Sequence, residues 1–238
     1  LLQKAQQTGA DFDMLKAPLD PEERARIDAE DNTSLILVDI PTIEMEGKDF
    51  VYSTIPLGIL TTENHLITVC LKDSHIMRDF AQNHVKGFFT YKKTRFILQI
   101  LYRNASRYLQ YLRQIDKKTN AIETELQRTL RNQELMQLMR LEKSLVFFAT
   151  SLKSNEIVLE KLLRSDLIRR FPDDEDLLED VIIENKQAIE MCAIYRDILS
   201  STMDAFSSVI SNNVNDIMKV LTSLTLVLSI PTLIASIW

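Results

Sequence analysis

The C-terminal stretch decides the fold of this chain. Residues 172–238 read PDDEDLLEDVIIENKQAIEMCAIYRDILSSTMDAFSSVISNNVNDIMKVLTSLTLVLSIPTLIASIW. After the acidic opening Asp173–Asp176, the stretch contains no glycine, and its next proline is Pro231. Glycine and proline interrupt helices, so their absence predicts one continuous helix. At about 1.5 Å per residue, this helix would be on the order of 95 Å long.

The end of this stretch has the composition of a membrane-spanning segment. Val220 to Trp238 carries no charged residue, and about 20 apolar residues are enough to cross the hydrocarbon core as a helix. We therefore expect a first transmembrane helix at about residues 219–238. Because the sequence stops within this run or at its end, we also expect the chain to be cut off inside its membrane segment.

Polar residues follow one line along the predicted helix, which we call the polar seam. Their spacing alternates strictly between four and three residues, which is a heptad repeat with a period of 3.5. The seam consists of Asp204, Ser208, Ser211, Asn215, Met218, Thr222, Thr225, Ser229, Thr232 and Ser236. A second line at similar spacing is apolar and consists of Leu199, Met203, Phe206, Ile210, Val214, Ile217 and Leu221. The helix therefore combines an apolar packing face with a nearly all-polar line that continues into the membrane.

Two interpretations of the polar seam are open. Serine and threonine can enter membrane helices by bonding to carbonyl groups of the preceding turn, and small residues can mark close contacts between helices. That explanation suffices for any single residue of the seam. Ten positions in register are better explained by a water-lined axis that several copies of the helix share. The seam therefore predicts a pore.

Composition limits the class of protein. The 238 residues are 45% hydrophobic and 26% charged, which suits one soluble domain with an extension. The net charge of −6 argues against nucleic acid as a partner. Cys70 and Cys192 are far apart in sequence and have no CxxC spacing, which suits a reducing cytosol.

The N-terminal third has the pattern of β-strands. Leu35–Val38 predicts a buried strand that ends at Pro41, and two β-rich runs follow at residues 50–60 and 65–71, separated by a hairpin signal. Pro56 inside the first of these runs indicates an edge strand or a bulge. Strands followed by helices predict an α/β fold, in which a mixed sheet is flanked by helices as an αβα sandwich.

The middle of the chain predicts a helical hairpin. Residues 94–131 and 132–163 both show apolar positions at helical spacing, and two such helices joined by a short turn pack antiparallel. We expect three parts: an α/β domain at residues 1–90, the helical hairpin at 91–171, and a stalk helix at 172–238.

Catalytic motifs are missing from the sequence. The three histidines, His65, His75 and His84, have no metal-ligand spacing, and neither cysteine has a motif partner. We therefore do not expect an enzyme.

Carboxylates gather at two places. Asp173–Asp176 are explained as caps of the long helix and as partners of its dipole, an explanation that covers Glu179 and Asp180 less well. A second pair, Glu30 and Asp31, lies in a predicted hairpin. Carboxylate oxygens from separate segments suit a hard cation such as Mg²⁺ or Ca²⁺.

Several of these segments resemble the CorA family of divalent-cation transporters. The resemblance rests on Asn212–Thr222 and Pro231–Trp238, together with Lys143–Phe148 and the downstream pair Ser154–Asn155. It implies a homopentamer in the cell inner membrane, with two membrane helices per subunit and most of this chain in the cytoplasm. The family's Gly-Met-Asn signature directly follows the aromatic residue that Trp238 matches.

The resemblance also implies roles for individual residues. Asp204 corresponds to an acidic ring at the cytoplasmic mouth, and Asp180 corresponds to an aspartate that shares a regulatory metal ion with the neighbouring subunit. Glu30 and Asp31 are the expected partners of Asp180 in that site. The positions that match pore-facing positions of the family are Asn215, Met218, Leu221, Thr225, Ser229, Thr232 and Ser236.

These matches predict a transporter for Mg²⁺, and also for Co²⁺, that is gated by cytosolic Mg²⁺ bound between subunits. Two alternatives remain at this level. One is a zinc transporter of the same superfamily, and the other is a non-conducting, membrane-anchored helical scaffold. A scaffold built on an ordinary coiled coil would have apolar residues along its seam, whereas this seam is polar.

Overall fold

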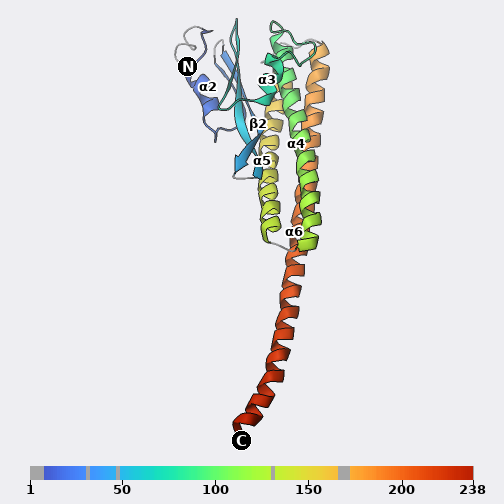
Figure 1. The fold of residues 1–238 in the computed structure, drawn as a ribbon. Helices are drawn as coiled ribbons and strands as arrows, with labels where there is room; N and C mark the ends of the chain where they lie inside the picture. The colour runs from blue at the N-terminus through green and yellow to red at the C-terminus, as the bar shows by residue number, and fades with distance from the viewer. Residues whose placement is uncertain (1–7, 31–32, 47–48, 130–131, 166–171, 238) are drawn as a thin grey trace.

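The computed structural model of the chain describes residues 8–30, 33–46, 49–129, 132–165 and 172–237 (Figure 1). A four-stranded sheet has the order β1-β2-β3-β4, and all three pairings are antiparallel. The strands are β1 (Arg26–Glu30), β2 (Thr33–Glu46), β3 (Asp49–Thr61) and β4 (Leu66–Cys70). The expected sheet with flanking helices is confirmed. The described strands differ from the expected mixed sheet in being entirely antiparallel, because each follows its neighbour directly in sequence.

Strand β2 runs through Pro41 instead of ending there, which corrects the expected boundary. The partner of Pro41 on β3 is Thr54, and Pro56 of β3 lies opposite Asp39. β1 pairs with β2 only as far as Leu37, and β4 pairs with β3 only from Leu57 onward. Both prolines therefore lie where the sheet is a two-stranded ribbon with open outer edges, so neither has to supply a hydrogen bond to a third strand.

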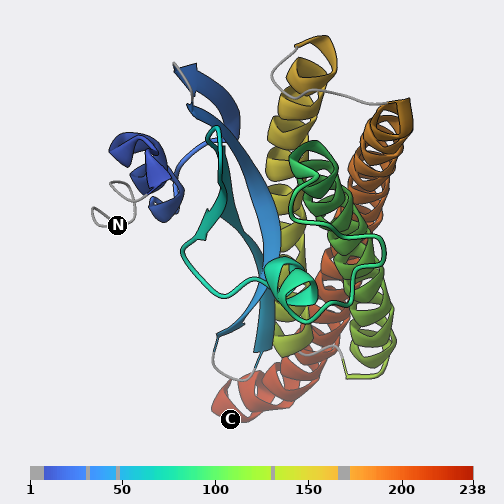
Figure 2. The same ribbon diagram turned by 90° about the horizontal axis from the view of Figure 1, so that it is seen from above.

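Helices cover both faces of the sheet. The short helices α2 (Phe12–Lys16) and η1 (Ala17–Leu19) lie on one side, and the long helices lie on the other (Figure 2). Leu35 and Leu37 of β2 pack against the α2 side, whereas Ile36, Val38 and Ile40 face the long helices. Because both faces are covered, Leu35–Val38 of β2 is a continuous apolar run instead of an alternating one.

Three long helices form a bundle beside the sheet. They are α4 (Lys93–Thr129), α5 (Asn132–Arg164) and α6 (Pro172–Ile237), and a short helix α3 (His75–Ala81) precedes them. α4 and α5 form the expected hairpin. α6 packs along this hairpin and then continues beyond it as a single rod (Figure 1). Among the described residues, the last buried side chain of α6 is Phe206, and nearly all side chains after it are exposed.

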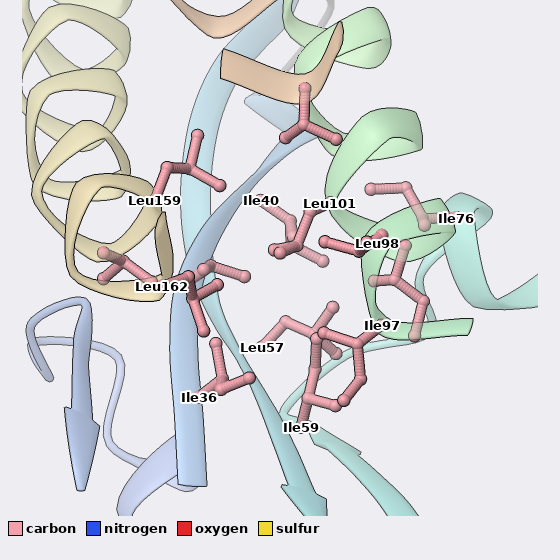
Figure 3. Packing of buried hydrophobic residues seen from close by; sticks show 14 of the residues in the cluster. Ile36, Ile40, Leu57, Ile59, Ile76, Ile97, Leu98, Leu101, Leu159 and Leu162 are labelled. Atoms are coloured by element: carbon pink, nitrogen blue, oxygen red, sulfur yellow. The ribbon is translucent and has the colours of Figure 1, made fainter. Parts of the chain in front are cut away.

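The main core lies between the sheet and the bundle. Residues from β2, β3, α4 and α5 point toward one another there, including Ile36, Leu57, Leu98 and Leu162 (Figure 3). At its upper end, α6 contributes Leu178 and Val181 to the same cluster. A second cluster, around Tyr108 and Phe148, joins the hairpin to the middle of α6. The stalk helix is therefore fixed to the domain by continuous apolar packing.

Candidate functional site

The polar seam lies on the part of α6 that projects from the bundle. Every seam residue from Asp204 to Ser236 is exposed in the single chain, apart from Ser229, which is half-buried. The apolar line is buried at Leu199 and Phe206, but it is exposed from Val214 onward. Within the described part of the chain, the side chains of both lines are therefore largely uncovered once α6 leaves the bundle.

The hydroxyl groups of the seam donate hydrogen bonds to carbonyl oxygens of the preceding turn. Thr222 Oγ1 donates to Met218 O at 2.8 Å, and Thr225 Oγ1 donates to Leu221 O at 2.8 Å. Ser208 and Ser236 bond in the same manner, with donor–acceptor distances of 3.0 and 2.9 Å. This is how hydroxyls enter an apolar helix without an unpaired donor. It leaves the oxygen lone pairs free to accept hydrogen bonds from water on a hydrated cation.

The helix continues through Pro231. Proline has no amide hydrogen, so one hydrogen bond of the helix is lost at this position. One residue later, Thr232 Oγ1 donates to Leu228 O at 3.1 Å and to Ser229 O at 2.8 Å. The hydroxyl group of Thr232 therefore supplies side-chain hydrogen bonds in the turn that Pro231 weakens.

By length and composition, α6 can cross a membrane, and the apolar segment near its C-terminal end is not buried in the domain. A core helix of a soluble protein would be mostly covered. The exposed large side chains on this part of the helix include Val220, Leu224, Val227, Leu228, Ile230, Leu233 and Ile234. In water such a surface is unstable, so it requires lipid or further protein around it.

The structure places two of the expected metal ligands on different elements of the chain. Asp180 is exposed on α6, and Glu30 is exposed at the end of β1. The α4–α5 hairpin lies between the sheet and most of α6 (Figure 2). Asp31 lies outside the described residues. Among the residues that the structure describes, no group of three His, Cys, Asp or Glu side chains is close enough to hold a metal ion.

One acid of the opening cluster has a structural role. Asp174 is 4% exposed, and its carboxylate lies 3.4 Å from Arg95 Nη1 at the start of α4. This ion pair joins the first turn of α6 to α4. Asp174 is therefore a packing residue, whereas Glu179 and Asp180 one turn later point to solvent.

The sequence analysis missed that the seam extends upstream. The same alternation of four and three residues continues from Asp204 toward the start of α6, and every position on it is exposed. We call this upper part the α6 acidic stripe; it consists of Asp176, Asp180, Ile183, Gln187, Glu190, Ile194, Asp197 and Ser201. The heptad spacing could have revealed it, but Ile183 and Ile194 interrupt the run of polar residues.

Comparison with known proteins identifies a family of membrane transporters. The family described as CorA-like Mg2+ transporter protein matches residues 4–238. The cobalt/magnesium transport protein CorA of Methanocaldococcus jannaschii is 27% identical over 247 residues, which cover 100% of this chain and 75% of that protein.

Solved structures agree with the fold. The complete structure of the CorA magnesium transporter from Methanocaldococcus jannaschii superposes with a TM-score of 0.84 at 25% identity, covering 99% of this chain and 74% of that one. The ZntB cytoplasmic domain from Vibrio parahaemolyticus has a TM-score of 0.69 at 12% identity, covering 89% of this chain and 83% of that one. This second likeness concerns the fold alone. Because the family match extends over residues 4–238, the chain belongs to the CorA-like Mg2+ transporter family, which consists of membrane transporters and not of enzymes.

Proposed function

We propose that this chain is the cytoplasmic metal-sensing domain and the first membrane helix of a homopentameric, channel-type transporter for Mg²⁺ and Co²⁺. Five copies of α6 would stand around one axis with their polar seams facing it. The membrane helix would lie in the cell membrane, and the sheet and the bundle would lie in the cytoplasm.

The polar seam is the observation that carries this proposal. It remains in register from Asp204 to Ser236, and it lies on a helix that is exposed all round once it leaves the bundle. A lipid-facing position would leave this line of hydroxyl and amide groups against hydrocarbon, which is unfavourable. An axis shared by several copies gives every seam residue an aqueous environment.

The donor atoms along the seam suit a hydrated hard cation. They are hydroxyl, amide and carboxylate oxygens, and Met218 adds one thioether. Mg²⁺ gives up its water reluctantly and prefers oxygen ligands, so oxygens that accept hydrogen bonds can guide it with its water shell intact. Zinc sites usually contain histidine or cysteine, and the seam contains neither. The likeness to ZntB therefore adds little support for zinc as the cargo.

Met218 and Leu221 are the proposed gate. Both are exposed apolar residues, about one helical turn apart, at the cytoplasmic end of the uncharged segment. Met218 is 53% exposed and Leu221 is 55% exposed. Rings of apolar side chains around a narrow axis can stop conduction by excluding water. A small outward tilt of the helices would let water enter.

Asp180 and the acids of the neighbouring copy are the proposed sensor. The oxygen ligands of Asp180, Glu30 and Asp31 fit a hard cation, and Mg²⁺ typically uses only one or two carboxylates with water completing its shell. A bound divalent cation would offset the repulsion among these carboxylates. Without it, the carboxylates repel one another and loosen the interface between copies.

The long packed section of α6 would connect sensor to gate. Asn185 Nδ2 donates to Leu152 O at 3.2 Å, and Cys192 Sγ donates to Leu145 O at 3.2 Å. With the buried residues between Leu178 and Phe206, these contacts hold α6 to α5 over many turns. A change in the orientation of the domain would therefore move the free part of the helix with it.

The sensor can be tested by limited proteolysis of the full-length transporter in the presence and absence of Mg²⁺. Wild-type protein should be protected from cleavage when Mg²⁺ is added, and Asp180→Ala should lose most of this protection. Glu175→Ala is the matched control, because Glu175 is an exposed acid in the same region of α6 on another side of the helix. Unchanged protection in Asp180→Ala would show that the sensor role is wrong.

A further inference from the structure

The outer surface of α5 is unusually apolar for a helix that faces water. Met136, Met139, Val146 and Ile157 are 54, 47, 49 and 68% exposed. α4, the other helix of the hairpin, has no large apolar side chain among the exposed ones in its described length. α5 packs on β1, β2 and β3 and along α6, and its outer surface is nevertheless apolar, which indicates that something else covers this surface.

Seven of the exposed residues of α5 form one line. The line has heptad spacing and runs along the side of the helix that faces away from the sheet and from α6. We call it the α5 outer stripe; it consists of Met136, Met139, Lys143, Val146, Thr150, Lys153 and Ile157. Its only charged members are Lys143 and Lys153, so the stripe is apolar and positive.

The α6 acidic stripe has the complementary composition. Its charged members are all acidic, and they include Glu190 and Asp197. Its apolar members Ile183 and Ile194 are each 55% exposed. Each stripe spans about 20 to 25 residues, which corresponds to roughly 30 to 40 Å of helix. The two surfaces are therefore complementary in charge and similar in length, and both carry exposed apolar side chains.

The two stripes cannot meet within one chain, because each faces away from the interface between its own helices. Contacts between α5 and α6 do show which residues lie at the same height. Leu152 lies beside Asn185, and Leu145 lies beside Cys192. In both pairs the residue numbers add to 337. By the same relation Lys143 is level with position 194, within about one turn of Glu190 and Asp197.

We propose that the α5 outer stripe of one copy packs against the α6 acidic stripe of the next copy around the ring. This inference rests on the proposed homo-oligomer. A rotation about an axis parallel to α6 keeps every residue at its own height, so Lys143 of one copy meets Glu190 and Asp197 of the next. Such a contact joins two different surfaces, and it closes into a ring when the rotation closes.

The interface has a clear division of roles. The methionine, valine and isoleucine side chains are removed from water, and the lysine–carboxylate pairs select the partner and fix its height. Only one side of the α6 acidic stripe has to be covered, so its other side can still face the axis. The proposal therefore leaves the seam available for ions.

Cysteine crosslinking in the full-length protein tests this contact. In a background with Cys70→Ser and Cys192→Ala, the pair Lys143→Cys and Asp197→Cys is treated with a short bismaleimide. The matched control combines Lys143→Cys with Asp176→Cys, which is exposed on the same stripe but about 27 Å above the level of Lys143. The proposal predicts a ladder of crosslinked species up to five subunits for the first pair and none for the control.

Charge exchange gives a second readout. Lys143→Glu and Asp197→Lys should each lower the fraction of pentamer by severalfold at low protein concentration, and the double variant should restore it. Light scattering of the same samples measures subunit number. If five subunits assemble but the Lys143–Asp197 pair crosslinks no better than the control, the interface is overturned and the proposed function stands. If the protein is monomeric, the interface and the proposed pentamer are both overturned.

Discussion

At the scale of single residues, the buried side chain of Asn155 holds the sheet on the helical hairpin. The backbone of Asp39 donates to Asn155 Oδ1 at 2.8 Å and accepts from Asn155 Nδ2 at 2.8 Å. Asn104 Nδ2 and the Tyr108 hydroxyl donate to the same carbonyl oxygen at 2.8 and 3.2 Å. These bonds occupy the ribbon next to Pro41, where β2 has no outer strand. Buried and fully paired backbone groups of this kind fix one packing of sheet on helices.

Gly58 allows the closest approach between the sheet and the N-terminal segment. A Cβ atom at this position would lie 2.1 Å from Pro18 Cγ and 3.4 Å from Leu35 Cδ1. We expect Gly58→Ala to lower the free energy of unfolding by about 1–3 kcal/mol, the usual cost of overpacking a core. Urea denaturation measures the change. The double variant Pro18→Ala/Gly58→Ala removes the clashing ring atom, so it should lose less stability than the two single changes added together.

Cys192 makes stability depend on pH in the alkaline range. Burial raises the pKa of its thiol to about 11, whereas a thiol in an unfolded chain titrates near about 8.5. Above this lower value the unfolded state loses its proton first, so stability falls as the pH rises toward the folded pKa. Between pH 8 and 9.5 we expect this effect to lower the unfolding free energy by about 1 kcal/mol.

Replacing Cys192 with alanine should remove that part of the decline. The measurement is the unfolding free energy from urea denaturation at several pH values between 8 and 9.5, with Cys70→Ala as the control for the less buried thiol. Identical pH slopes for wild type and Cys192→Ala would contradict a buried, protonated thiol at this position.

At the scale of elements, periodicity allowed α6 to be predicted almost completely. The absence of glycine over the whole stretch and the steady heptad spacing are local signals, and a helix is a local structure. The end of β2 was predicted wrongly at Pro41, because tolerance of a proline depends on whether a third strand pairs at that position. That pairing depends on the lengths of β1 and β4, which no residue near Pro41 indicates.

The proposed role of Leu221 in the gate also depends on the helix, because it requires that Leu221 lie on the face of α6 that lines the axis. If Leu221 contributes to a dewetted gate, Leu221→Asn should wet the gate and raise ion uptake severalfold when cytosolic Mg²⁺ is high. Val220→Asn is the matched control, because the neighbouring residue faces another side of the helix. The measurement is Mg²⁺ or Co²⁺ uptake into proteoliposomes. Equal uptake for both variants would contradict the gate.

At the scale of the whole molecule, the metal sensor remains a proposal about residues from two chains. The sequence could show that helix capping explains Asp180 poorly and that Glu30 belongs to a second acidic pair. It could not show which residues of a neighbouring copy these two acids meet. The structure places Glu30 on the sheet and Asp180 on α6, and Asp31 lies outside the described residues. A site between subunits depends on how the copies pack, and that information is distributed over surfaces such as the α5 outer stripe.

The seam and the two stripes give one consistent arrangement of copies. In the proposed assembly, the seam faces the axis below the bundle, and the α6 acidic stripe continues the same line upward beside the domain. In that assembly, the side of this line that the neighbouring copy leaves uncovered carries negative charge toward the axis, which raises the local concentration of cations at the cytoplasmic mouth. Asp204 lies at the junction, two residues before Phe206, the last buried residue of the packed section.

Cysteine accessibility in the membrane tests whether the polar seam lines a water-filled axis. Single cysteines at Thr222, Thr225, Ser229 and Thr232 are exposed to a charged, membrane-impermeant thiol reagent, and Val227→Cys and Ile234→Cys serve as controls on the opposite side of the helix. The account predicts fast modification at the four seam positions, slowed by added Mg²⁺, and little at the controls. Fast modification at the controls with protected seam positions would contradict it.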